Sequence, residues 1–405
     1  MRYLFPLSPY NQQRQFQKPV WVYPCHLAAY ATYLRNEGHE VVWDYSYGDY
    51  EKICKCGSRM ETAYHPQYAY TKSAKCFKCN RSVDYSVDFQ LWTPKKIKQE
   101  HLWHRSDFKQ DENNLKHYDY EINNDFQIDI PFEKLPFPDR EFTDAMNSRW
   151  QRYGNYRYHP ATHMMVSNLC WYGKCIFCVD TLKLQQGEKR GLRSVDHVME
   201  EIDDLIRLGF REVFDDSGTF PVGAWLEEFH RKMQKRKKHI RIGINMKPIK
   251  MDYKLLADAG VGFTLVGIES ANQHTVDRIQ KGQKSEDIID IMKAMNDAGL
   301  KVHLTSMFGY EWETHDDAMR TVHLVHHLLK KGYVKTAQAS VYSPPRTQPD
   351  PNSPGHKYIT KVYEAYRSPS FWLHKIKDIR RIEDITYMLR GGRLVMEEYL
   401  RKTFR

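Results

Sequence analysis

Three cysteines lie within nine residues of this sequence, close enough for their sulfurs to share one metal centre. They are Cys170, Cys175 and Cys178, and they belong to the segment Cys-Trp-Tyr-Gly-Lys-Cys-Ile-Phe-Cys. A closed structural zinc site uses four protein ligands, so three thiolates leave one coordination position open. An iron–sulfur cluster held by three cysteines likewise keeps one iron free for a substrate or cofactor. Three ordinary buried cysteines, or a zinc site completed by a distant histidine, are the alternatives.

Four more cysteines form two short knuckles earlier in the chain: Cys54 and Cys56, followed by Gly57, and then Cys76 and Cys79. Four thiolates from two turns suit tetrahedral zinc, and glycine after a knuckle allows the tight turn whose amides bond the sulfurs. The spacing predicts a zinc-ribbon-like insertion at about residues 50–85. An auxiliary iron–sulfur cluster is the alternative.

The elements that must position the cysteine trio begin near residue 163. From there, short apolar runs alternate with amphipathic segments, which is typical of βα units around a parallel sheet. We expect six strands, at His163–Ser167, Glu212–Asp215, Ile240–Met246, Phe263–Ile268, Val302–Phe308 and Thr336–Tyr342. Ser194 and Ser285 predict helix starts, and Gly209 and Gly299 predict the matching ends. The trio follows the first strand, and the loops after such strands carry the chemistry of barrel folds.

The first part of the chain reads as a βαβ unit. Its strands are expected at Tyr3–Phe5 and Val41–Trp43, with a helix at His26–Asn36 between them. The pattern predicts a reduced Rossmann-like domain over residues 1–140 that carries the cysteine-rich insertion. A partial barrel is expected over residues 150–345. A basic helical extension is expected over residues 346–405.

Composition narrows the function classes. The chain has 405 residues, 41% hydrophobic and 13% aromatic, which predicts a globular protein of two or three domains. No apolar run reaches the roughly 18 to 20 residues of a membrane span, and the start of the chain lacks a signal peptide, so we expect a cytoplasmic protein. The net charge is +10, and residues 356–405 hold 12 basic and 6 acidic side chains, or +6. This tail suits either a solvated helical face or an anionic partner such as tRNA.

The sequence resembles the radical S-adenosylmethionine (radical SAM) enzymes, in the subgroup with an N-terminal cobalamin-binding-like domain. The resemblance rests on five motifs in family order: the trio with Phe177, Phe214–Phe220, Gly267–Ser270, Met307–Thr314 and Tyr342–Thr347. It implies an α/β fold with a partial (β/α)6 barrel and a [4Fe–4S] cluster on the trio. The cluster would cleave SAM to a 5′-deoxyadenosyl radical that abstracts hydrogen from an unidentified substrate. A reductant such as flavodoxin or ferredoxin would supply the electron.

The resemblance also implies cofactor contacts at eight residues. They are Phe177, Asp215, Asp216, Asn245, Glu269, Ser270, Gly309 and Tyr342. A carboxylate can accept from the methionine ammonium, as expected of the aspartates, or from ribose hydroxyls, as expected of Glu269. Ser270 could instead, or also, cap a helix. Lys247 stands where the family commonly has an arginine, and a lysine cannot form the same bidentate fork.

Two departures from the family pattern stand out. Cys170 and Cys175 enclose four residues where three are usual, and no Asp-x-His-x-x-Gly string occurs, so the sequence gives no support for cobalamin. Within the enzyme class, a tRNA-modifying methyl- or methylthiotransferase is the alternative reaction. In another class, the chain would be a non-catalytic zinc or iron–sulfur protein that binds nucleic acid.

Overall fold

The computed structural model describes residues 1–6, 23–44, 61–64, 71–75, 82–84, 120–121, 128, 130–147, 151, 156–345, 347, 349–350 and 352–389. Its chain divides into two compact units, one of residues 1–130 and 134–153 and one of residues 131–133 and 154–405. The expected zinc ligands Cys54, Cys56, Cys76 and Cys79 lie outside the described residues. No helix in the described ranges is long and apolar enough to cross a membrane.

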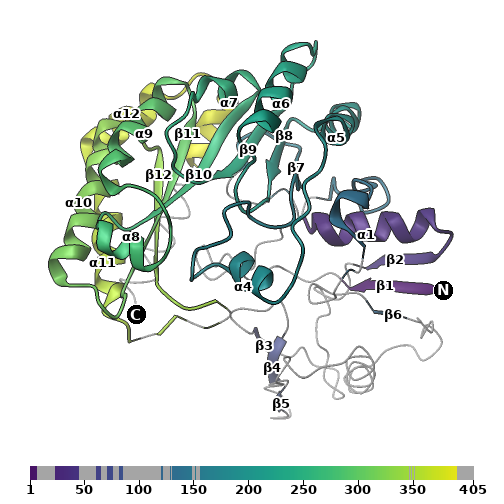
Figure 1. Ribbon diagram of the computed structural model, residues 1–405, viewed down its shortest axis with the longest axis horizontal. Helices are drawn as coiled ribbons and strands as arrows, with labels where there is room; N and C mark the ends of the chain where they lie inside the picture. The colour runs from purple at the N-terminus through teal and green to yellow at the C-terminus, as the bar shows by residue number, and fades with distance from the viewer. Residues whose placement is uncertain are drawn as a thin grey trace. The chain divides into compact units, whose positions relative to one another are not determined.

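The second unit is built on one parallel sheet of six strands, in the order β12-β11-β10-β9-β8-β7 (Figure 1). The strands are β7 (Ala161–Met164), β8 (Glu212–Asp215), β9 (Arg241–Met246), β10 (Val261–Glu269), β11 (Lys301–Phe308) and β12 (Thr336–Val341). Each expected strand is present, β8 with the expected bounds and the others with ends that differ by at most three residues. Sequential order with parallel pairing makes this a partial (β/α)6 barrel, as the sequence predicted.

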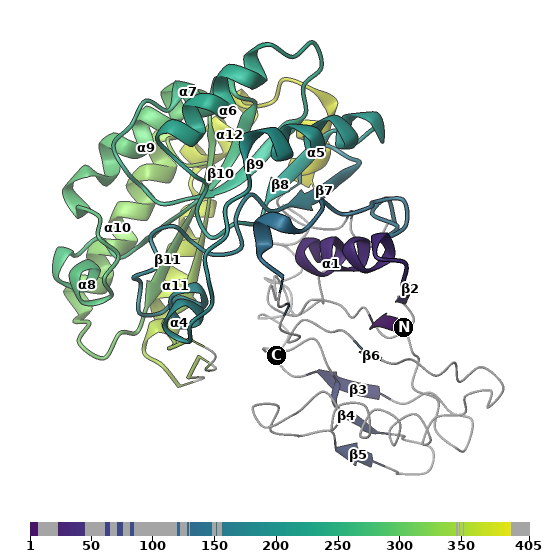
Figure 2. The ribbon, with the colours of Figure 1, turned by 45° about the vertical axis from the view of Figure 1, so that its right-hand side comes forward.

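Helices form an outer layer along this sheet (Figure 2). This layer contains α5 (Val195–Arg207), α6 (Ala224–Gln234), α7 (Lys254–Asp258), α9 (Ile288–Asp297) and α10 (His315–Lys331), while the short helices α4 (Val179–Gln185) and α8 (Gln273–Arg278) follow β7 and β10. Alternate strand residues such as Val213, Ile242 and Val302 are fully buried beneath them. Burial of these aliphatic side chains is the main force that holds helices and sheet together.

The expected helix boundaries hold at three of four positions. The Ser194 hydroxyl accepts from the amide of His197 at 3.2 Å and caps α5, and Gly209 and Gly299 end helices with φ of 87° and 90°. Ser285 is not the cap of α9, contrary to our expectation. It opens the 3-10 turn η5 (Ser285–Asp287), and its amide donates to the Gln273 side chain at 2.8 Å.

The C-terminal extension is helical and packs on the barrel. It comprises α11 (Gly355–Glu364), the turn η6 (Ala365–Arg367), α12 (Pro369–Lys377) and helical residues 382–389. The Tyr366 hydroxyl accepts from the Ala337 amide at 2.7 Å and donates to its carbonyl at 2.6 Å. An unpaired strand edge invites pairing with other chains, so this tyrosine protects the edge of β12.

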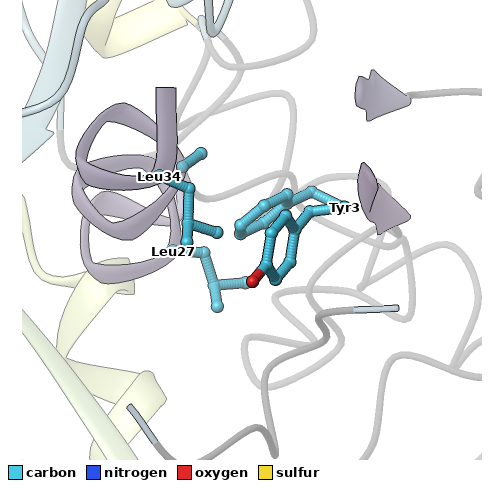
Figure 3. Close-up of a cluster of buried hydrophobic side chains, with 5 residues drawn as sticks. Tyr3, Leu27 and Leu34 are labelled. Carbon is cyan, nitrogen blue, oxygen red and sulfur yellow. The ribbon is translucent and has the colours of Figure 1, made fainter. Parts of the chain in front are cut away.

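The first unit contains the βαβ opening that the sequence predicted. Strands β1 (Arg2–Pro6), β2 (Glu40–Asp44) and β6 (Tyr120–Glu121) form a parallel sheet in the order β2-β1-β6, and α1 (Cys25–Asn36) connects the first two. Figure 3 shows Tyr3, Leu27 and Leu34 in the small core between helix and sheet. A separate antiparallel sheet joins β3 (Glu61–Tyr64), β4 (Thr71–Lys75) and β5 (Ser82–Asp84).

Candidate functional site

The cysteine trio occupies the loop between β7 and α4, at the carboxyl edge of the sheet. All three thiols are free and partly exposed, and Cys178 stands directly before the first residue of α4. Burial raises the pKa of Cys178 to about 11, with the nearby Asp180 charge adding to the effect, so thiolates here need a positive partner. A metal centre would supply that charge.

The described residues do not form a ready-made site for a single metal ion. No three histidine, cysteine or acidic side chains of the described chain gather closely enough to hold one ion. Two thiolates on one zinc lie at most about 4.6 Å apart, twice the Zn–S bond, whereas each thiolate of a cluster binds a different iron. The three free thiols lie on one loop, where each could bind a different iron of a cluster.

Close packing fixes the first cysteine of the loop. The Cys170 amide donates to Asp180 at 2.8 Å, its carbonyl accepts from Arg190 at 3.1 Å, and its thiol donates to Thr219 at 3.4 Å. A Cβ atom at Gly218 would lie 2.7 Å from the Cys170 Cβ. Only glycine lets the loop after β8 approach the cysteine this closely.

Asp215, the last residue of β8, turns into the protein. Its Oδ1 accepts from the Val166 amide and the Ser217 hydroxyl, both at 2.8 Å, and the side chain is fully buried. Burial raises its pKa to about 7. These bonds hold the segment that leads to Cys170, so the geometry gives Asp215 a supporting role.

Asp216 has the opposite environment. Its side chain is exposed to solvent, while surrounding protein and the charge of Asp180 raise its pKa to about 7. Among the described residues, no ion pair or hydrogen bond of this carboxyl is found. Asp216 is thus the aspartate available to a ligand.

Glu269 ends β10 in a strained conformation. Its φ is +60°, and the register of the strand shifts between Gly267 and Glu269. Non-glycine residues rarely adopt this conformation, and it often marks functional sites. The carboxylate is 5% exposed and accepts from the Lys281 ammonium at 2.8 Å. Burial by itself lowers the pKa of Lys281, but Glu269 outweighs it and raises the pKa.

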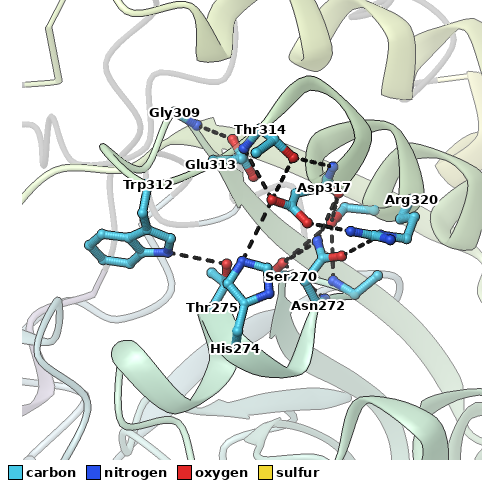
Figure 4. Close-up of polar contacts among 12 residues, drawn as sticks. Ser270, Asn272, His274, Thr275, Gly309, Trp312, Glu313, Thr314, Asp317 and Arg320 are labelled. Carbon is cyan, nitrogen blue, oxygen red and sulfur yellow. Dashed lines mark hydrogen bonds and ion pairs between the residues drawn. The ribbon is translucent and has the colours of Figure 1, made fainter.

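Ser270 faces the helices instead (Figure 4). Its buried hydroxyl accepts from the amide and side chain of Asn272, at 3.2 Å and 3.1 Å, and lies 3.4 Å from the Thr321 hydroxyl of α10. Asn272, not Ser270, is the residue at the N-cap of α8. The hydroxyl that the resemblance placed near the cofactor is therefore engaged by the protein.

The same network fixes the start of α10. Thr314 and Asp317 form a capping box, and Asp317 also pairs with Arg320 at 2.5 Å (Figure 4). Burial acts to raise the pKa of Asp317, but hydrogen bonds from Thr314 and Arg320 outweigh it and lower the pKa to about 2. Arg320 also donates to Asn272 at 2.7 Å, which joins α10 to the loop after β10. The network is a scaffold for that loop.

Gly309 and Tyr342 lie after β11 and β12. Gly309 has φ of +85°, and a Cβ there would lie 3.3 Å from Gly355 of the chain itself. Its amide donates to Glu313 at 2.7 Å. The side-chain face of this glycine is therefore covered by α11, which accounts for the residue without a ligand.

An aromatic group surrounds Tyr342. Its ring centroid lies 4.7 Å from that of Tyr310 and 6.3 Å from that of Trp312. The Tyr310 hydroxyl is buried with no partner in the described chain, and burial together with Glu269 and Glu313 raises its pKa well above the usual value. A buried unpaired hydroxyl is costly, so a ligand that bonds Tyr310 would relieve the cost. Our sequence reasoning did not single out Tyr310 because tyrosines are common in this chain.

Asn245 and Lys247 support the loops around the trio. The Asn245 side chain donates to the Ser217 carbonyl at 2.9 Å, and Lys247 donates to the Gly282 carbonyl at 2.8 Å. Phe177 lies beside Lys281, whose ammonium is 5.6 Å from the ring centroid. Lys281 is a second residue that the sequence did not reveal, because only the fold brings it beside Phe177.

Comparison with known proteins agrees with this geometry. Residues 164–325 match the family described as the Radical SAM superfamily. A Methanocaldococcus jannaschii protein named Putative methylthiotransferase MJ0865 is 24% identical over 161 residues, which are 37% of this chain. The match spans 35% of that relative's own length.

Solved structures show remote similarity. The methyltransferase TsrM from Kitasatospora setae, with tryptophan and a SAM analogue, is 19% identical at a TM-score of 0.39, over 46% of this chain and 36% of TsrM. The enzyme OxsB, with aqua-cobalamin and SAM, is 12% identical at a TM-score of 0.48, over 91% of this chain and 55% of OxsB. Scores this low carry no argument about the reaction. They also give no support to our expectation that the chain lacks cobalamin, which stays a prediction.

Proposed function

This chain carries a radical SAM domain, and from that premise we propose that it binds a [4Fe–4S] cluster on Cys170, Cys175 and Cys178 and uses SAM to start radical chemistry. When bound, the cluster would supply the electron that cleaves the carbon–sulfur bond of SAM, to give methionine and a 5′-deoxyadenosyl radical. The radical takes a hydrogen atom from a substrate that is not identified here.

One observation supports this proposal above the others. The three free thiols, the open carboxyl of Asp216 and the carboxylate of Glu269 all follow strands of one parallel sheet and lie at its carboxyl edge. Ligands of barrel folds bind at this edge, because the loops after the strands converge there. A cluster that only stabilised the fold would not need acidic residues at the ends of the neighbouring strands.

The chain's own residues bind and orient the cofactor. Asp216 is free to accept from the methionine ammonium, which makes a charge-assisted hydrogen bond. Glu269 can accept from ribose hydroxyls while Lys281 holds its carboxylate in place. The buried Tyr310 hydroxyl lies near Glu269 and can donate a hydrogen bond. Asp215 supports the segment before the cysteine loop by accepting from the Val166 amide.

Anaerobic reconstitution tests the proposal directly. The wild-type protein should take up four irons per chain on this site, as expected of one [4Fe–4S] cluster, and should form 5′-deoxyadenosine from SAM with dithionite. Cys175→Ala should lose the cluster absorbance of the trio. Cys25→Ala is the matched control, since Cys25 lies in α1 of the other unit and should not change that absorbance. A cluster that survives in Cys175→Ala would refute the assignment.

Transfer of a methylthio or methyl group is a second candidate for the reaction. The M. jannaschii relative supports it by name, although the match spans 35% of that protein. Incubation with methyl-labelled SAM and a tRNA pool should then put label into RNA. Label found only in methionine would exclude methyl transfer to RNA under these conditions.

A zinc ribbon at Cys54, Cys56, Cys76 and Cys79 also stays a proposal. Three short antiparallel strands, β3, β4 and β5, lie between and beside the two knuckles, which is an arrangement that a ribbon would use. Metal analysis of a variant that lacks the Cys170, Cys175 and Cys178 thiols should still find zinc. A protein with neither zinc nor iron would argue against it, and bound iron would favour an auxiliary cluster. A flavodoxin or ferredoxin as reductant and a cytoplasmic location likewise stay predictions.

A further inference from the structure

The turn of residues 279–282, which follows α8, is held by two hydrogen bonds from the cysteine loop and one from Lys247, the residue after β9. The Ile176 amide donates to the Ile279 carbonyl at 3.2 Å. The Tyr172 hydroxyl donates to the Gln280 carbonyl at 3.0 Å, and Lys247 donates to the Gly282 carbonyl at 2.8 Å. The two segments are about a hundred residues apart in sequence, so the fold alone unites them.

The backbone of this turn is shaped by the contact. Gln280 and Gly282 have φ of +54° and +60°. A Cβ atom at Gly282 would collide with the Tyr172 hydroxyl, so a larger residue would push the turn from the loop. The Lys247 ammonium also lies 3.4 Å from the centre of the Tyr172 ring, a cation–π contact that links Lys247 to the cysteine loop. The position of residue 281 is therefore fixed relative to the cysteines.

Lys281 extends from this turn toward the trio. Its side chain is 11% exposed, and its ammonium lies 2.8 Å from Glu269 and 5.6 Å from the ring of Phe177, the residue before Cys178. Phe177 lies between Cys175 and Cys178 in the sequence, so this contact places the ammonium beside the cysteine loop. A buried ammonium beside cluster ligands acts strongly, because the protein interior screens charge less than water does.

We propose that the positive charge of Lys281 raises the reduction potential of the bound cluster and that the negative charge of Glu269 limits this rise. This inference rests on the proposed cluster. Reduction adds a negative charge to the cluster, and a nearby positive charge stabilises the reduced state. The ion pair thus serves two purposes, since it also orients the Glu269 carboxylate.

The test is a spectroscopic redox titration of cluster-loaded protein without SAM. Lys281→Met keeps the length of the side chain and removes its charge, and we expect a more negative midpoint potential. A tenfold change in the ratio of reduced to oxidised cluster at fixed potential corresponds to 59 mV for one electron. Lys281→Arg should keep the wild-type potential. Lys284→Met is the matched control, because Lys284 lies in the same segment but is exposed.

Glu269→Gln should shift the midpoint potential of the cluster in the opposite direction. It removes the negative partner and should move the potential upward, an effect that mere loosening of the loop would not produce. If Lys281→Met does not retain its cluster, Glu269→Gln carries the test. An unchanged potential in every cluster-loaded variant of the pair would overturn the proposal for Lys281 alone. Failure of the wild type to bind a cluster would instead overturn the proposed function.

Discussion

The ends of β8 and β10 carry the same pattern, with two adjacent polar residues each. At β8, Asp215 is buried in bonds to the chain and Asp216 is open. At β10, Ser270 is buried in bonds to the helices and Glu269 points toward the cysteine side, where it meets Lys281. One member of each pair supports the fold, and we propose that the other binds the cofactor.

The two strand ends differ in the surroundings of the carboxyl that we propose binds the cofactor. Glu269 is buried, strained and paired with a lysine, whereas Asp216 has no cation partner in the described part of the chain. A paired carboxylate is oriented before a ligand arrives, while an unpaired one can gain a new charge partner on binding. We therefore expect changes at Glu269 to affect stability and changes at Asp216 to affect cofactor affinity.

The largest effect is expected for Glu269→Ala. It leaves the Lys281 ammonium buried without its partner, which should lower the free energy of unfolding by about 3 to 5 kcal/mol. Chemical denaturation of the protein measures this loss. Glu311→Ala is the control, because Glu311 is an exposed acid in the loop after β11. Equal stability of the two variants would show that the ion pair does not support the fold.

Asp215→Ala should come second. It removes the acceptor of the Val166 amide and the Ser217 hydroxyl, a loss of about 1 to 3 kcal/mol. Asp215→Asn should lose less, because an amide keeps an acceptor and brings no charge into a site that raises the pKa to about 7. The order would be reversed if the Asp215 charge itself were needed. Thermal unfolding of both variants at pH 8 decides between these outcomes.

Asp216→Asn should weaken SAM binding by about tenfold, or about 1.4 kcal/mol. Its stability should stay within about 0.5 kcal/mol of the wild type, since the carboxyl makes no described bond to the chain. Equilibrium binding to cluster-loaded protein measures the affinity. Unchanged affinity would assign the methionine ammonium to another residue.

Ser270→Ala should have the smallest effect. It removes a buried hydroxyl from the network with Asn272 and Thr321, at a cost of about 1 kcal/mol. SAM affinity should not change, because the hydroxyl faces the helices. A tenfold loss of affinity with normal stability would return Ser270 to the cofactor site.

Local patterns predicted the fold of the second unit closely. Periodicity located all six strands, because each is a short apolar run bounded by turn residues, and glycine marked the ends of α5 and α9. The cap of α9 was missed because the side chain of Gln273, which is distant in sequence, holds the amide of Ser285. Such a bond leaves no local signal.

The sequence by itself determined the chemistry of this protein: which thiols could bind a cluster, and which strand ends carry acids. Only the tertiary structure decided which of two neighbours faces a ligand. Asp215 and Asp216 are the same residue type, but Asp215 ends β8 and accepts from the Val166 amide and the Ser217 hydroxyl, and these bonds select it as the buried one. Lys281 lies beside Phe177 of the cysteine loop because contacts between remote segments fix its turn, and no spacing in the sequence encodes those contacts.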